Sequence, residues 1–165
     1  MHFYIYLPSN VICEHAGNTA ASYIVPLNPP IELKHNNFEV ALVEISHPSV
    51  DMSDFTTKIV GGGEKKNKVK NKTVPSLMFI YCSVVKGITV GNACVPLLRA
   101  CTVKFTKESS NTNTNLSFAK PFYQPIACQF IDKIEITISS QTGDSFPFKS
   151  GISLACLHFR ENKPK

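Results

Sequence analysis

Short apolar runs alternate with clusters of proline, glycine and polar residues along the chain, a pattern typical of β-strands joined by turns. The run over residues 38–48 is apolar at both alternating sets of positions, which predicts a central strand buried on both faces. Its carboxylates, Glu39 and Glu44, would lie on opposite faces of a regular strand. Because burying an unpaired charge is costly, each is expected to reach solvent, a sheet edge or a partner.

The other predicted strands are laid around this one. Residues 128–139 alternate most regularly, with Phe130 and Ile134 on one side and Ile131 on the other. Residues 116–126 contain two prolines, which cannot donate a ladder hydrogen bond, so this run is at best an edge strand. The remaining candidates cover residues 2–7, 22–27, 55–60, 76–85, 95–105 with an irregularity at Pro96, and 151–159, with a short extended piece at 146–148. Turns are expected at 28–30, 87–92 and 141–144, and residues 31–33 lead from the first of these turns toward the central strand.

The composition agrees with one all-β domain. The 165 residues are 43% hydrophobic and 18% charged, which is globular composition, and no stretch has a convincing amphipathic-helix period. Many short strands with turn signals between them indicate a sandwich or barrel, and the uneven loops favour a jelly roll. We therefore predict a single jelly-roll β-sandwich of about eight strands in two antiparallel sheets, forming one domain over residues 1–165.

The positive charge is concentrated in one predicted loop. The formal net charge is +5, and residues 61–72, with five Lys and one Glu (5 − 1 = +4), account for most of it. Aromatic residues are not interleaved with these lysines, so the loop does not have the pattern of a base-stacking platform. We interpret it as an exposed, solvated loop. The alternative is a weak contact with nucleic acid or another polyanion through Lys65, Lys66, Lys68, Lys70 and Lys72.

The cysteines and the first residues point to a protein made inside the cell and not secreted. The first eight residues lack the basic start and the apolar length of a signal peptide, and no stretch approaches the length of a membrane span. The six cysteines are scattered, mostly inside apolar runs, which predicts small buried hydrophobes and no disulfide framework. They are Cys13, Cys82, Cys94, Cys101, Cys128 and Cys156.

Candidate catalytic groups are sparse. Cys156 and His158 share a face of the last predicted strand and could act as nucleophile and base or bind a metal. No third group is evident, so a buried cysteine beside a strand-end histidine is the preferred interpretation. Cys13 and His15 lie in a loop without metal-site spacing, and the glycines at 61–63 lack the rest of a phosphate-binding loop. We therefore predict no enzyme activity and no catalytic, cofactor or metal site.

With the strands placed, short segments through most of the chain resemble the minor capsid, or penton, proteins encoded by Polinton (Maverick) elements and adintovirus-like viruses. None is diagnostic alone, but their order and spacing agree with that family. In chain order they are LPSN at 7–10, NTA at 18–20, PIEL at 30–33, EVALVEI at 39–45, Pro48, VG at 90–91, LLR at 97–99, PFYQP at 121–125, FIDKIEI at 130–136, Gly143, FPF at 146–148, Gly151 and LHFR at 157–160.

The resemblance implies a single jelly roll that assembles as a homopentamer at the fivefold vertices of an icosahedral shell. There it would be surrounded by a double-jelly-roll major capsid protein, so the expected location is the virion, with no membrane partner. The family has no catalytic residues to carry over, and Glu39 and Glu44 would then be structural. The chain has no long insertion and no Arg-Gly-Asp triplet, so integrin-type receptor binding is not implied. The loop at 61–72 has no counterpart in the matched segments, and residues 160–165 form a short charged tail.

The sequence is also compatible with two other classes of protein. A β-sandwich recognition module, carbohydrate-binding or cytokine-like and without catalytic activity, would have the same strand pattern, although such modules favour a secretion signal and paired cysteines. A protein based on Cys156 and His158 would bind metal or lose activity when Cys156 is replaced. The sequence leaves open which residues form a subunit contact, and whether the lysine loop faces a packaged genome or the exterior.

Overall fold

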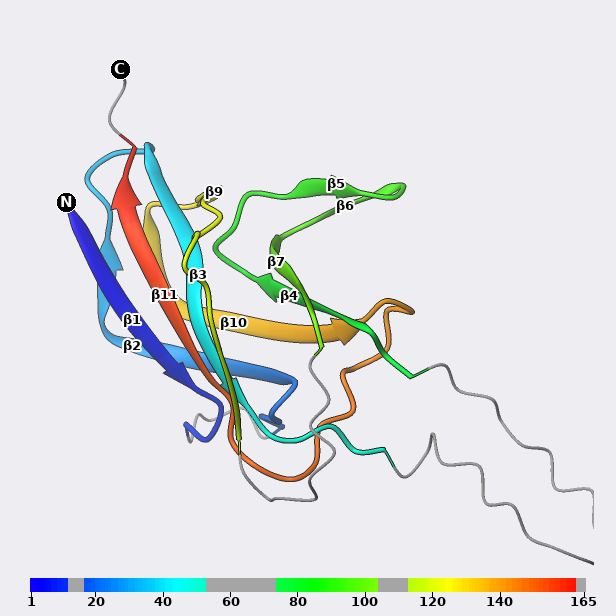
Figure 1. Cartoon of the computed structure of the whole chain (residues 1–165). Helices are drawn as coiled ribbons and strands as arrows, with labels where there is room; N and C mark the ends of the chain where they lie inside the picture. Colours follow the sequence, from blue (N-terminus) through cyan, green and yellow to red (C-terminus); the bar gives the residue numbers. More distant parts are fainter. Residues whose placement is uncertain (12–16, 53–73, 104–112, 163–165) are drawn as a thin grey trace, which may run out of the picture.

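The computed structural model describes residues 1–11, 17–52, 74–103 and 113–162. Within these ranges the chain is all-β, with eleven strands, no helix and antiparallel pairing throughout. The strands form three sheets, two of which build the body of the molecule (Figure 1). The all-β class is confirmed, whereas eleven strands in three sheets replace the expected count of about eight in two. The predicted strand at 55–60 lies outside the described residues.

The first sheet is built around the central strand that the sequence predicted at residues 38–48. Strand β3 (Phe38–His47) pairs with β11 (Leu154–Glu161) on one side and with β8 (Thr114–Ser117) and β9 (Gln124–Pro125) on the other. Strand β1 (His2–Pro8) pairs with β11 and forms the outer edge. The run predicted at 116–126 therefore forms two short strands at the opposite edge of the sheet, as its prolines indicated.

The second sheet has β10 at its centre. Strand β10 (Phe130–Ser140) lies between β2 (Ser22–Glu32) and β4 (Leu77–Cys82), and β7 (Leu97–Thr102) pairs with β4. The third sheet is a hairpin of β5 and β6 within the connection from β4 to β7, where only a turn was expected; the bounds are Ile88–Val90 and Ala93–Val95. Pro96 separates β6 from β7, which confirms the predicted irregularity.

Two register irregularities change which side chains face the core. Between Ile131 and Lys133 the pairing of β10 with β2 shifts, and residues 27–30 of β2 oppose Asp132 alone. The prediction that Phe130 shares the side of Ile134 is therefore wrong: Phe130 is 60% exposed, while Ile131 is 1% exposed and joins the core. The predicted turn at 28–30 is also wrong. Strand β2 runs through these residues, and Pro29 and Pro30 fall in the register shift, where they interrupt no ladder hydrogen bond to β10.

The second irregularity lies in β3. Leu42 pairs with Leu157 and Glu44 with Cys156, so Val43 is an extra residue opposite β11. This bulge puts Glu44 on the same outer face as Glu39, and the expectation of opposite faces is wrong. Burial on both faces of the strand holds for Ala41, which is fully covered, but not for Glu44, which is exposed.

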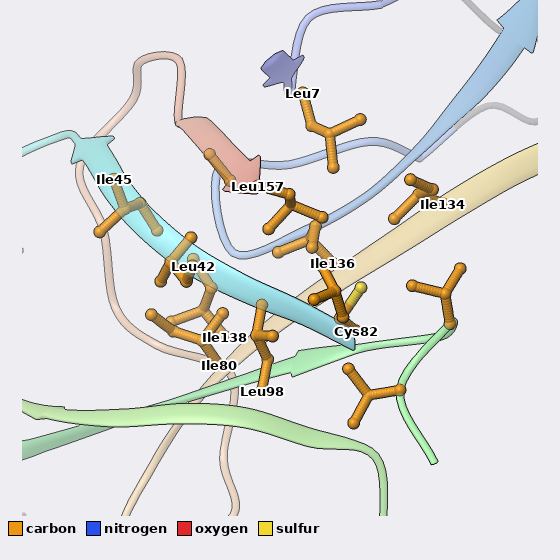
Figure 2. Close-up of a cluster of buried hydrophobic side chains, with 14 of the residues drawn as sticks. Leu7, Leu42, Ile45, Ile80, Cys82, Leu98, Ile134, Ile136, Ile138 and Leu157 are labelled. Atoms are coloured by element: carbon orange, nitrogen blue, oxygen red, sulfur yellow. The ribbon is translucent and has the colours of Figure 1, made fainter. Parts of the chain in front are cut away.

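The core lies between the two large sheets. Figure 2 shows aliphatic side chains from both sheets pointing toward one another, and in the part of the chain that is described they form one continuous buried cluster. Each fully buried side chain of this size contributes about 1.5–3 kcal/mol relative to exposure. The labelled members include Leu7, Leu42 and Leu157 from the first sheet and Ile80, Ile136 and Ile138 from the second.

Candidate functional site

The outer face of the first sheet, turned away from the core, carries aromatic side chains in a row across the strands. Tyr4 of β1 pairs with His158 of β11, and His158 pairs with Ala41 of β3. Gln124 of β9 pairs with Val40, which brings Tyr123 beside Ala41. We call the group Tyr4, Tyr6, Tyr123, His158 and Arg160 the outer aromatic face.

His158 is the centre of this face. Its ring stacks on Tyr4 with centroids 4.4 Å apart, and its Nδ1 lies 2.7 Å from the hydroxyl oxygen of Tyr123. His2 makes an edge contact with it at 5.6 Å. The other ring nitrogen, Nε2, is buried without a hydrogen-bond partner in the described ranges. The histidine thus joins the edge strand β1 to the segment before β9 across the full width of the sheet.

The pKa of His158 is lowered from its ordinary value. Burial disfavours the charged imidazolium, and the neighbouring His2 and Arg160 oppose a further positive charge. His47 shares the direction of shift: its pKa is lowered by burial, partly offset by a hydrogen bond from Nδ1–H to the Pro48 carbonyl at 2.8 Å. Both histidines are therefore held neutral in the folded protein near pH 7.

Acid is therefore expected to destabilise the fold through His158. The unfolded chain takes up a proton at about pH 6.5 and the folded chain only at lower pH, so stability is full above that range and falls as the pH drops through it. His158→Gln should reduce the fall in melting temperature between about pH 7.5 and pH 5. His47 remains in the variant, so some slope persists. Thermal unfolding at each pH measures this, with His35→Gln at an exposed histidine as the control; an undiminished slope would contradict the assignment.

Glu39 has the partner that its position requires. Arg160 donates to its Oε2 from Nε at 3.1 Å and from an Nη2 at 3.0 Å, and Asn162 donates to Oε1 at 3.0 Å. The guanidinium carbon of Arg160 also lies 3.4 Å from the centre of the Tyr123 ring. The negative charge of Glu39 is thereby paired at the end of the sheet, and the pair holds the arginine over the Tyr123 ring.

Glu44 lies in a different setting. It is exposed in the next row of the outer face, beside Cys156 and Tyr6, and has no ion-pair partner among residues 1–11, 17–52, 74–103 and 113–162. Tyr6 is 61% exposed and Tyr4 is 57% exposed. This part of the face therefore offers two aromatic rings and a free negative charge to a partner.

The thiol and imidazole of the last strand are not arranged as a nucleophile and base. Cys156 and His158 do share the outer face, but His158 Nδ1 is engaged by Tyr123. Burial raises the pKa of Cys156, so its thiol stays protonated near pH 7. In the described part of the chain, no three His, Cys, Asp or Glu side chains are grouped so that they could hold a metal ion. The expectation of no enzyme activity stays a prediction.

A second surface feature lies beside the edge strand β7. A hollow of about 460 Å³ is bounded by β7 and by the segment before β9, and its lining is largely apolar. Phe122 stands at its rim, 62% exposed. Arg99 lies in it with its guanidinium carbon 3.8 Å from the Phe118 ring centre and donates to the Lys120 carbonyl at 3.3 Å. We call it the β7 groove, lined by Leu97, Arg99, Ala100, Lys120, Pro121 and Phe122 among others.

Several residues singled out from the sequence fall elsewhere. The five lysines of the loop at 61–72, with Cys13 and His15, lie outside the described residues. The five described cysteines are free, but burial was wrongly expected for Cys94 and Cys128, which are exposed. The outer aromatic face and the β7 groove were missed. The only local signal was the alternation of Tyr4 and Tyr6 at an edge strand, since the other members come from distant segments.

A comparison with protein-family models finds no match, and no curated protein matches the chain. Nowhere in the described ranges is there a helix of the length and apolarity needed to span a membrane.

Proposed function

We propose that the chain is a structural capsid protein: a single jelly-roll penton subunit that forms a homopentameric vertex of an icosahedral shell. Its partners would be other copies of itself and a double-jelly-roll major capsid protein, in the virion. The function would be carried by surfaces rather than by a reaction centre. Weak contact of the lysine loop with nucleic acid is a secondary part of this proposal and concerns residues outside the described ranges.

The strand order is the observation that carries the proposal. Leaving aside the hairpin and β9, eight described strands make up the two large sheets. Numbered one to eight along the chain, they are ordered 1-8-3-6 in the first sheet and 2-7-4-5 in the second. Two interlocked Greek keys would insert late strands between early ones in both sheets. This order therefore supports the proposed jelly roll, an arrangement that many capsid proteins use.

The segments that carry the penton resemblance lie at structurally decisive places. EVALVEI is most of β3, FIDKIEI begins β10, and LHFR belongs to β11. Tyr123 comes from the PFYQP segment and His158 from LHFR, so two matched segments meet in the hydrogen bond on the outer face. The resemblance therefore concerns positions that hold the fold together, which supports a shared architecture.

The oligomeric state of the purified protein tests the proposal. A ring of five 18.2 kDa subunits has a mass of about 91 kDa, measurable by light scattering, and electron microscopy would show fivefold particles. Co-expression with a double-jelly-roll major capsid protein should place the chain at shell vertices. A monomer at high concentration that is also absent from particles would overturn the proposal. A trimer, or a monomer that binds glycans, would favour the recognition-module alternative.

A further inference from the structure

We propose that the ring contact is head-to-tail, with the outer aromatic face of one copy packed against the β7 groove of the next. The occupant of the groove is thus a second copy of this chain, presenting Tyr4, Tyr6 and Glu44. This inference rests on the proposed self-association and adds the two surfaces that make it.

The outer aromatic face has the properties of one half of such a contact. Tyr4 and Tyr6 lie on β1, which pairs only with β11 in the described part of the sheet, and both rings are more than half exposed. Tyrosine rings on an edge strand supply large contact area and lose little conformational entropy when they are buried. Glu44 adds a negative charge next to them. Arg160, the arginine of this face, is paired with Glu39 and therefore does not neutralise Glu44.

The β7 groove has complementary chemistry. It is a hollow with exposed Phe122 at its rim, and its lining holds two cations, Arg99 and Lys120, and no carboxylate. The guanidinium of Arg99 is held in place by the Phe118 ring and the Lys120 carbonyl, so its positive charge is fixed beside the hollow. An aromatic and acidic surface therefore fits this groove better than a basic or purely apolar one.

The placement of the two surfaces argues for different patches on successive copies. Strand β1, which carries Tyr4 and Tyr6, is the edge of the first sheet, and β7 is the far edge of the second (Figure 1). The other end of the face, at Tyr123, adjoins the groove through the shared segment 120–124. A contact of either surface with itself would bring Glu44 toward Glu44, or Lys120 toward Lys120. Pairing the face of one copy with the groove of the next joins opposite charges. Each pair of copies then still has one unused face and one unused groove, so further copies can be added until a ring closes.

Charge reversal tests the pairing. Glu44→Lys and Lys120→Glu should each weaken ring assembly by about tenfold or more, and the double variant should recover much of the loss. The matched controls are Glu135→Lys and Lys133→Glu, at exposed positions of β10 in the second sheet, and they should leave assembly unchanged. Assembly is followed by light scattering across a dilution series. Singles that assemble like the wild type, or a double no better than the singles, would overturn the pairing.

Mixing two defective variants tests the head-to-tail geometry. Tyr4→Ser/Tyr6→Ser removes the two exposed rings of the outer aromatic face, and Phe122→Ser damages the groove. All three side chains are more than half exposed, so circular dichroism should be unchanged. Each variant alone should fail to form rings. A mixture retains one intact face and one intact groove, so it should stop at dimers that contain one copy of each variant. Phe130→Ser is the control for an exposed phenylalanine and should still form rings.

The outcomes separate this inference from the proposed function. If all the face and groove variants form rings as the wild type does, the head-to-tail contact is overturned, but the proposed ring formation is not. Rings that are lost equally in Phe130→Ser would place the contact elsewhere and also overturn it. A wild-type chain that stays monomeric would remove the proposed function and this inference together.

Discussion

Replacement of Ile136 by alanine is expected to lower the free energy of unfolding by about 2–5 kcal/mol. Ile136 is fully buried in β10 and pairs with Tyr23 of β2 and Cys82 of β4, so it lies in the middle of the second sheet. Figure 2 shows it in the cluster between the two sheets. Truncation there removes burial and leaves a cavity that the rigid strands on both sides cannot fill by collapsing.

Urea denaturation followed by circular dichroism measures this loss, and wild type and variant must be compared at one protein concentration because assembly adds to stability. Glu135→Ala changes the exposed neighbour on the same strand and should alter the free energy of unfolding by no more than about 0.5 kcal/mol. If Ile136→Ala cost no more than this control, Ile136 would not be part of a packed core.

Replacement of Ala41 by leucine is expected to destabilise the protein by about 1–3 kcal/mol, although alanine to leucine adds apolar surface. Ala41 is fully covered on the outer face, where Tyr123 reaches past β3 to His158. A methyl group leaves room for that ring, and an isobutyl group would push it away from His158 and Arg160. The loss combines overpacking with the broken hydrogen bond.

A double-mutant cycle with Tyr123→Ala identifies the cause. With the ring removed, leucine at position 41 should cost much less, so the two effects on unfolding free energy should not add. Ala93→Leu, at an exposed position of β6, is the control and should be nearly neutral. Additive effects would show that Tyr123 does not cover Ala41.

The sequence pattern predicted the strand positions well where a strand is a continuous apolar run. The prediction for 38–48 ends one residue beyond β3, and that for 2–7 ends one residue short of β1, because apolar runs closed by proline are read from neighbours in sequence. The same reasoning placed Phe130 on the side of Ile134, since strict alternation carries no information about a bulge. The register shift depends on how many residues of β2 oppose β10, which is a property of the pair.

The sequence by itself determined the all-β class, most strand positions and the two carboxylates that had to reach solvent, a sheet edge or a partner, because these follow from hydrophobic periodicity and proline placement. Only the tertiary structure decided the order of strands in each sheet and the bulge at Val43 that gathers Glu39 and Glu44 on one face. It also decided the contact of Tyr123 with His158, 35 residues apart. These features arise from pairing between distant segments, whose register is chosen by the packing of the whole core.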